Sequence, residues 1–140
     1  MVTFPSEEWI ALFKEKLNNN THYKEIAKEW EGDFLFIISP DEYYKKEMIF
    51  YVDLWHGTCR KAYVTDKTHQ AAFIFKGPYS SWKKVIKKEL DPIRGLIRGM
   101  FILEGDSKVI LDQTKAAQEL VTTASTIPVE FEDEPRGTNY

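Results

Sequence analysis

The residues that most often carry out chemistry are few and widely separated in this sequence. The histidines, His22, His56 and His69, lack the short spacings to cysteine or carboxylate residues that metal sites show. Cys59 follows His56 by three residues, which raises the hypothesis of a nucleophile beside a base. Asp53 and His56 would similarly form an acid–base pair. Both groups fall at the end of a predicted hairpin, where no oxyanion site is expected, so we expect no catalysis, no metal and no cofactor.

The overall composition argues against several other classes of protein. A formal charge of −3 and a pI near 5.7 differ from the basic excess of nucleic-acid-binding proteins. The sequence contains no P-loop, Gly-x-Gly-x-x-Gly or Gly-x-Ser-x-Gly motif. We therefore expect no nucleic-acid partner and no nucleotide or hydrolase chemistry.

The chain is rich in large apolar side chains but has no long apolar run. Its 140 residues suit one domain, and they include nine Phe, seven Tyr and four Trp, which fill a core or line a hole. No apolar run is longer than residues 34–38, which have the length of a strand, so no membrane span is expected. A single cysteine and the lack of a leader segment predict a cytoplasmic protein.

Two amphipathic helices are predicted in residues 1–31. Ser6 suits the N-cap of the first, because two glutamates follow it in the turn where negative charge is favourable. The second helix, residues 21–30, is expected to begin with Thr21 as its cap. The first part of the chain is therefore helical.

A strand meander is predicted in residues 32–76. Strands are expected at residues 34–38, 46–55, 58–65 and 71–75, where residues are β-rich or alternate between polar and apolar types. The pair His56 and Gly57 suits the tight turn of a hairpin. We expect these strands to pair antiparallel.

The hydrophobic period changes from two to about 3.6 in residues 78–125. Ser80 is a candidate N-cap for one helix, and Asp91, before a proline, begins another. Residues 100–103 are apolar enough for one further strand beside the meander. This part is therefore predicted to be helical around one strand.

A last helix is expected from Ser107, with a break near residues 112–114. Residues 1–128 then form a single domain, and the acidic residues 129–140 form a tail that is expected to be partly disordered. The order of elements predicts an α+β fold, in which a mainly antiparallel sheet of about five strands has helices covering one face.

Residues 91–106, DPIRGLIRGMFILEGD, resemble the centre of the sterol-carrier-protein family. In that family a short helix with a small residue leads into a glycine, five residues of strand and a second glycine before Asp or Asn. The matching positions are Gly95, Gly99, Gly105 and Asp106, with Phe101 and Leu103 at the apolar strand positions. The order of predicted elements also fits over residues 34–124. The resemblance implies a hydrophobic tunnel that accepts sterols, fatty acids, acyl-CoA or other lipids, without covalent chemistry or a cofactor.

Such a site would be lined by the inward faces of the C-terminal helices, the last strand and the sheet. Each methylene buried there contributes about 0.8 kcal/mol, so a lipid supplies much of its own binding energy. The candidate ligand-binding residues of the helices and last strand are Trp82, Ile86, Leu90, Leu96, Ile97, Met100, Ile102, Ile110, Leu120 and Val121. Those of the sheet are Phe36, Tyr51, Phe73 and Phe75, although alternation does not say which face looks inward. A filled core would show the same pattern.

Three functions are compatible with these patterns. The first is a non-catalytic lipid carrier or sequestration protein with transient membrane contact. The second is an interaction or accessory module that assists an enzyme, with the cavity filled. The third is an enzyme that uses His56 or Cys59. Membrane contact would use Trp9, Phe13, Trp30 and Trp55, or the basic face of Lys83, Lys84, Lys87 and Lys88, although helix packing and a solvated face are simpler roles.

Overall fold

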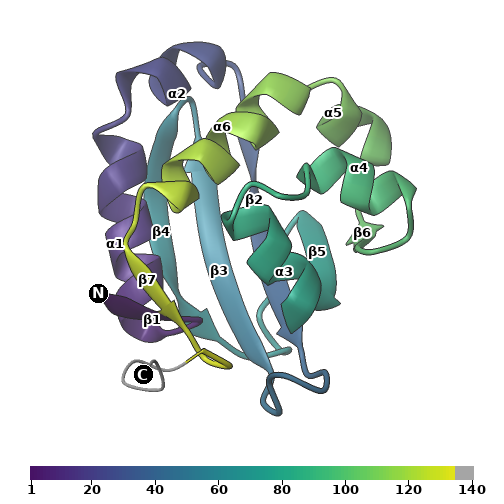
Figure 1. The fold of residues 1–140 in the computed structure, drawn as a ribbon. Coiled ribbons are helices and arrows are strands. Elements are labelled where there is room, and N and C mark those ends of the chain that lie inside the picture. Colours follow the sequence, from purple (N-terminus) through teal and green to yellow (C-terminus); the bar gives the residue numbers. More distant parts are fainter. Residues whose placement is uncertain (135–140) are drawn as a thin grey trace.

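The computed structural model describes residues 1–134, and in this part of the chain a five-stranded sheet carries helices over one face (Figure 1). In chain order the elements are β1 (Val2–Phe4), α1 (Glu7–Asn18), α2 (Thr21–Ile26), β2 (Glu31–Ser39), β3 (Met48–Trp55), β4 (Thr58–Thr65), β5 (Phe73–Pro78), α3 (Tyr79–Ile86), α4 (Pro92–Ile97), β6 (Ile102–Glu104), α5 (Ser107–Leu111), α6 (Thr114–Ser125) and β7 (Val129–Phe131). The predicted α+β class, with helices covering one face of the sheet, is confirmed.

The strands of the main sheet lie in the order β4-β3-β2-β5-β6. β2, β3 and β4 form the predicted antiparallel meander, and the turn between β3 and β4 places His56 and Gly57 at φ angles of 49° and 79°. β5 instead pairs in parallel with β2, so the prediction of antiparallel pairing throughout residues 32–76 is wrong for this strand. β6 returns antiparallel to β5, as the predicted further strand.

The parallel pairing of β5 follows from the path of the chain after β4. Residues 66–72 pass over the face of the sheet that carries no helix, where the ring of His69 stacks on Tyr51 at 4.0 Å. The amide of Ala72 donates to Oδ1 of Asp33 at 2.7 Å. The chain thereby reaches the far side of β2 and enters β5 in the direction of β2. Alternation in a sequence specifies the two faces of a strand but not its neighbour, so this pairing was not predictable.

A second, two-stranded sheet was not predicted. β1 pairs in parallel with β7, which brings together the two ends of the described chain. Residues 129–131, which were expected to begin the acidic tail, form the strand β7. Each strand has three residues, too few for an alternating pattern to identify it. The expected disorder at positions 135–140 lies outside the described residues.

Side chains on α3 hold the segment that follows β7. Oδ1 of Asp133 accepts hydrogen bonds from the hydroxyl of Tyr79 at 2.6 Å and from Nζ of Lys83 at 3.0 Å. Burial alone would raise the pKa of Asp133, but these hydrogen bonds, with the charge of Lys83, lower it below its ordinary value. Residues 129–134 are thus attached to the helical layer.

The helix caps agree only partly with the sequence predictions. Ser6 and Asp91 accept backbone N–H groups as predicted caps of α1 and α4. The second helix is capped by Asn20 instead of Thr21, and α3 begins before Ser80. The longest described helices, α1 and α6, have 12 residues each, and no helix in residues 1–134 is long and apolar enough to cross a bilayer.

The glycines around β6 make room for the ring of Phe101. A Cβ atom at Gly95 would lie 2.8 Å from Cδ2 of this ring, and one at Gly77 would also overlap it. Gly99 and Gly105 have φ angles of 76° and 120°, in the region that favours glycine. Gly95 is therefore required by the packing of Phe101 against α4, whereas Gly99 and Gly105 are favoured by the positive φ angles on either side of β6.

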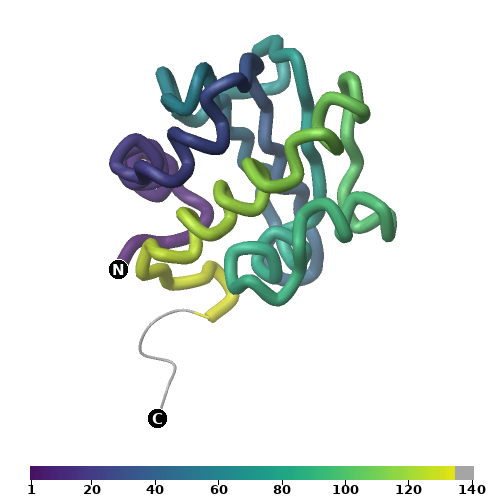
Figure 2. The backbone as a smooth tube through the Cα atoms, turned by 90° about the horizontal axis from the view of Figure 1, so that it is seen from above, coloured from purple at the N-terminus to yellow at the C-terminus, as the bar shows by residue number. Residues whose placement is uncertain are grey.

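The helices lie across the sheet in one layer. α6 runs over the covered face between α1 and α3, as the view from above shows (Figure 2). Phe34, Phe36 and Phe50 point toward these helices, whereas Leu35 and Ile37 point to the opposite face and form a separate apolar cluster. The three phenylalanines and α6 therefore face each other across the interior of the protein.

Candidate functional site

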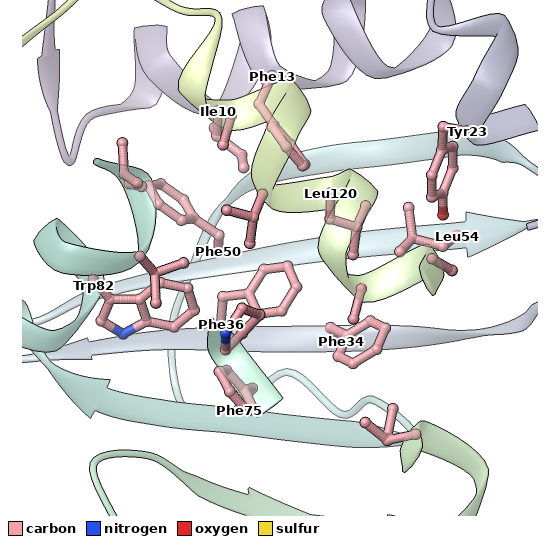
Figure 3. Close-up of a pocket in the computed structure, with 18 of the residues that line it drawn as sticks. Ile10, Phe13, Tyr23, Phe34, Phe36, Phe50, Leu54, Phe75, Trp82 and Leu120 are labelled. Atoms are coloured by element: carbon pink, nitrogen blue, oxygen red, sulfur yellow. The ribbon is translucent and has the colours of Figure 1, made fainter. Parts of the chain in front are cut away.

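An apolar cavity of about 120 Å³ lies between the covered face of the sheet and the helices (Figure 3). Elements from β1 to α6 contribute to its wall. The lining residues are Phe4, Trp9, Ile10, Phe13, Tyr23, Trp30, Phe34, Phe36, Ile38, Phe50, Leu54, Phe75, Trp82, Val85, Ile86, Pro92, Ile93, Ile110, Gln113, Ala116, Ala117, Leu120, Val121 and Ala124.

The wall consists mostly of interacting aromatic rings. Phe36 stacks on Phe34 with ring centroids 5.1 Å apart, and Trp82 meets Phe36 edge-on at 5.6 Å. Trp82 also contacts Phe75 edge-on at 5.8 Å. On the opposite side of the cavity, α6 presents smaller side chains such as Ala117. A sheet with large rings facing a helix with small residues leaves the space that the cavity occupies.

Two indole groups of the wall donate hydrogen bonds within the protein. Nε1 of Trp30 donates to the carbonyl of Gly32 at 3.1 Å, and Nε1 of Trp82 donates to the carbonyl of Ile37 at 3.0 Å. Nε1 of Trp9 is buried without a hydrogen-bond acceptor among residues 1–134. The wall is mostly apolar, which suits a hydrocarbon.

Comparison with known proteins identifies the family to which this fold and cavity belong. The chain matches the model of the SCP-2 sterol transfer family over residues 10–118. It belongs to this family. The resemblance drawn from residues 91–106 is thus confirmed.

Solved structures of the SCP-2 family resemble this chain over most of its length. A crystal structure of sterol carrier protein 2 has 31% sequence identity and a TM-score of 0.79, covering 88% of this chain and 98% of the other. The solution structure of a conserved hypothetical protein from Thermus thermophilus, described as possibly a sterol carrier protein, has 30% identity and a TM-score of 0.82, covering 89% and 90%. No curated protein shows a significant sequence match.

The same fold also occurs inside a larger enzyme. An inverting sec-alkylsulfatase from Pseudomonas sp. aligns with 79% of this chain but only 16% of its own, with a TM-score of 0.54. At 14% identity this likeness shows the fold alone. SCP-2 folds are therefore found both as whole small chains and as parts of enzymes.

Half of the predicted ligand-binding residues of this SCP-2 family member line the cavity. These seven are Phe36, Phe75, Trp82, Ile86, Ile110, Leu120 and Val121. Phe73, Leu90, Leu96 and Met100 instead pack in the core beside it. That the lining residues contact a bound ligand stays a prediction.

Three of the predicted residues do not face the cavity. Ile102 is 62% exposed, because alternation along β6 turns Phe101 and Leu103 inward and Ile102 outward. Ile97, at the end of α4, is 75% exposed, while the preceding Leu96 packs inward. Tyr51 belongs to the cluster on the helix-free face of the sheet, again because of alternation. These three assignments are wrong.

The sequence reasoning missed the part of the wall that comes from the first elements. Phe4, Trp9, Ile10 and Phe13 of β1 and α1 line the cavity. The helical spacing of Trp9, Ile10 and Phe13 in α1 could have identified them, because the apolar face of an amphipathic helix packs against the interior of the protein. Trp9, Phe13 and Trp30 are buried, which agrees with helix packing and argues against membrane docking by these rings.

The residues considered for catalysis have separate structural partners. Nε2 of His56 lies 2.6 Å from Glu31 at an exposed hairpin end. Asp53 accepts two hydrogen bonds from Arg60, at 3.0 and 3.2 Å. Burial raises the pKa of the Cys59 thiol to about 11, so little thiolate forms near neutral pH. Among residues 1–134, no three His, Cys, Asp or Glu side chains lie together as a metal site.

Proposed function

We propose that this chain acts as a single domain that binds a lipid non-covalently in the apolar cavity and carries or sequesters it without a chemical step. The observation that supports this most strongly is an interior space lined by hydrocarbon, in a fold of the SCP-2 sterol transfer family. Binding would be driven by apolar burial, about 0.8 kcal/mol per methylene. Such a site would select by shape and accept several lipids.

The size of the cavity limits what fits without movement. An apolar cavity of about 150 Å³ is enough to bind benzene, so 120 Å³ holds a short hydrocarbon segment. A sterol or a long chain would require α6 to move outward or the chain to extend past the wall. We propose that the bound lipid contacts Phe36, Trp82 and Leu120, which face this space from three elements.

Occlusion of the cavity tests this function. The variant Ala117→Phe places a ring on the cavity side of α6, and Lys115→Phe places the same ring on the exposed side of that helix. Native mass spectrometry before and after organic extraction should find co-purifying lipid on the wild type and on Lys115→Phe, and none on Ala117→Phe. Equal lipid on all three proteins would contradict binding in this cavity.

An accessory role beside an enzyme is the second candidate. It is favoured by the exposed side chains Ile97 and Ile102, which flank the Gly99 turn, and by the occurrence of this fold within an alkylsulfatase. This role replaces the first if no lipid is extracted and added acyl chains leave the melting temperature of the wild type unchanged.

A further inference from the structure

A second hollow, lined by both polar and apolar residues, adjoins the apolar cavity. This groove, of about 300 Å³, lies between α6 and the link from α3 to α4, which run beside each other in Figure 1. It is lined by Lys88, Leu90, Asp91, Pro92, Gln118, Val121 and Thr122. Pro92 and Val121 line the apolar cavity as well, so the two spaces share a wall.

The groove contains a cation without a counter-ion. Nζ of Lys88 donates a hydrogen bond to Oγ1 of Thr122 at 3.4 Å, and within residues 1–134 no carboxylate oxygen lies within 4 Å of it. Asp91 is the acidic residue of the lining, and its carboxylate accepts the amide of Arg94 as the cap of α4. The groove therefore offers an ammonium group, a hydroxyl and the amide of Gln118.

Lys88 occupies a position where glycine is the usual residue. The amides of Lys88 and Glu89 donate to the carbonyls of Val85 and Lys84, at 2.9 and 2.8 Å, which is the pattern of a Schellman motif at the end of α3. The φ angle of Lys88 is 61°, a conformation that glycine adopts without the steric cost of a Cβ atom. The backbone conformation does not favour lysine at position 88, which suggests that the lysine side chain has a function there.

We propose that this groove holds the anionic head group of a single-chain amphiphile whose hydrocarbon tail lies in the apolar cavity. This inference rests on the proposed function and specifies its ligand. Carboxylate or phosphate oxygens would accept hydrogen bonds from Lys88, Thr122 and Gln118, and the bond from the ammonium group is the strong, charge-assisted one. The groove is open to water, so the head group keeps part of its hydration and avoids the cost of a buried charge.

Lys88 is the cation of the groove lining, and Asp91 is its acidic residue. The preceding lysines are not part of this lining: Nζ of Lys83 pairs with Asp133 and Glu134, and Nζ of Lys87 lies 5.6 Å from the centroid of the Phe131 ring. The long tail that exceeds the 120 Å³ cavity would continue past Pro92 and Val121 toward the groove and Lys88. One amphiphile thereby uses both spaces.

Dissociation constants of dodecanoate, monododecyl phosphate and dodecanol at pH 8 test this inference. We expect the anions to bind the wild type about three- to tenfold more tightly than dodecanol, a preference that weakens with added salt. Lys88→Gln and Lys88→Gly should remove this preference, and Lys84→Gln, outside the groove lining, should keep it. Lys88→Gly should melt at the wild-type temperature or above, which separates lost affinity from lost stability.

The outcomes distinguish the head-group site from lipid binding itself. A preference for the carboxylate alone or the phosphate alone supports the site and identifies its head group. If all three ligands bind the wild type and Lys88→Gln with equal affinity, the head-group site is wrong, while lipid binding stands. If none of the three binds the wild type, the proposed function fails, and the head-group site fails with it.

Discussion

Replacing Gly95 with alanine sets two effects of opposite sign against each other. In an ordinary helix the change stabilises the protein by roughly 0.5–1 kcal/mol. In α4 the added Cβ would lie 2.8 and 3.1 Å from ring atoms of Phe101 and 3.3 Å from a methyl carbon of Leu90. Both neighbours are buried, so neither can turn into solvent. Overpacking of this kind costs about 1–3 kcal/mol, and we therefore expect Gly95→Ala to destabilise the protein by about 1–2 kcal/mol.

Urea unfolding followed by circular dichroism measures this change in the free energy of unfolding. Adding Phe101→Leu should relieve the contact, so a double-mutant cycle should show favourable coupling between the two substitutions. Gly99→Ala is the control, because a Cβ there meets no atom within 4 Å and only the φ of 76° opposes it. A Gly95→Ala variant that is more stable than the wild type, or that shows no coupling with Phe101→Leu, would refute the packing explanation of this motif.

Three further predictions concern single side chains. The lowered pKa of Asp133 means that its stabilisation is present above the ordinary pKa and is lost as pH falls through the lowered pKa. The wild type should exceed Asp133→Asn by about 1–3 kcal/mol in free energy of unfolding at pH 7. On acid titration this difference should begin to shrink near about pH 4 and vanish below the lowered pKa, whereas a pH-independent difference would contradict the assignment. With its pKa raised to about 11 by burial, Cys59 should react with a disulfide reagent at pH 8 only after unfolding, and rapid labelling of the native protein would show the thiol to be accessible. Trp30→Phe should cost about 1 kcal/mol more than Trp9→Phe, because of these two indoles that of Trp30 donates a hydrogen bond within residues 1–134 and that of Trp9 does not; equal losses of thermal stability would count against this.

Local signals in the sequence identified much of the fold. The caps at Ser6 and Asp91, the hairpin turn at His56 and the break between α5 and α6 depend on neighbouring residues, and all four were correctly predicted. The parallel pairing of β5 depends on where residues 66–72 cross the sheet, and local patterns carry no such information. The short strands β1 and β7 form by pairing with each other, and this pairing joins residues that are far apart in the sequence.

The wall of the cavity was only half predictable for a related reason. Periodicity places Trp82 and Ile86 on an inward face, but it gives the same result for a filled core and a cavity lining. Ile97 was misassigned because it was placed inward together with the adjacent Leu96. Ile102 was misassigned because alternation does not say which face of a strand looks inward. In the structure Phe101 and Leu103 are the inward residues of this segment, whereas Ile102 is exposed.

The central claim is that a lipid chain occupies the space between the sheet and α6. The most direct measurement is anomalous X-ray diffraction from crystals of the protein with a dodecanoate that carries bromine at the end of its tail. The account predicts bromine density among Phe36, Trp82 and Leu120, inside the wall of the cavity. Bromine density on the protein surface, with the cavity unchanged, would contradict it.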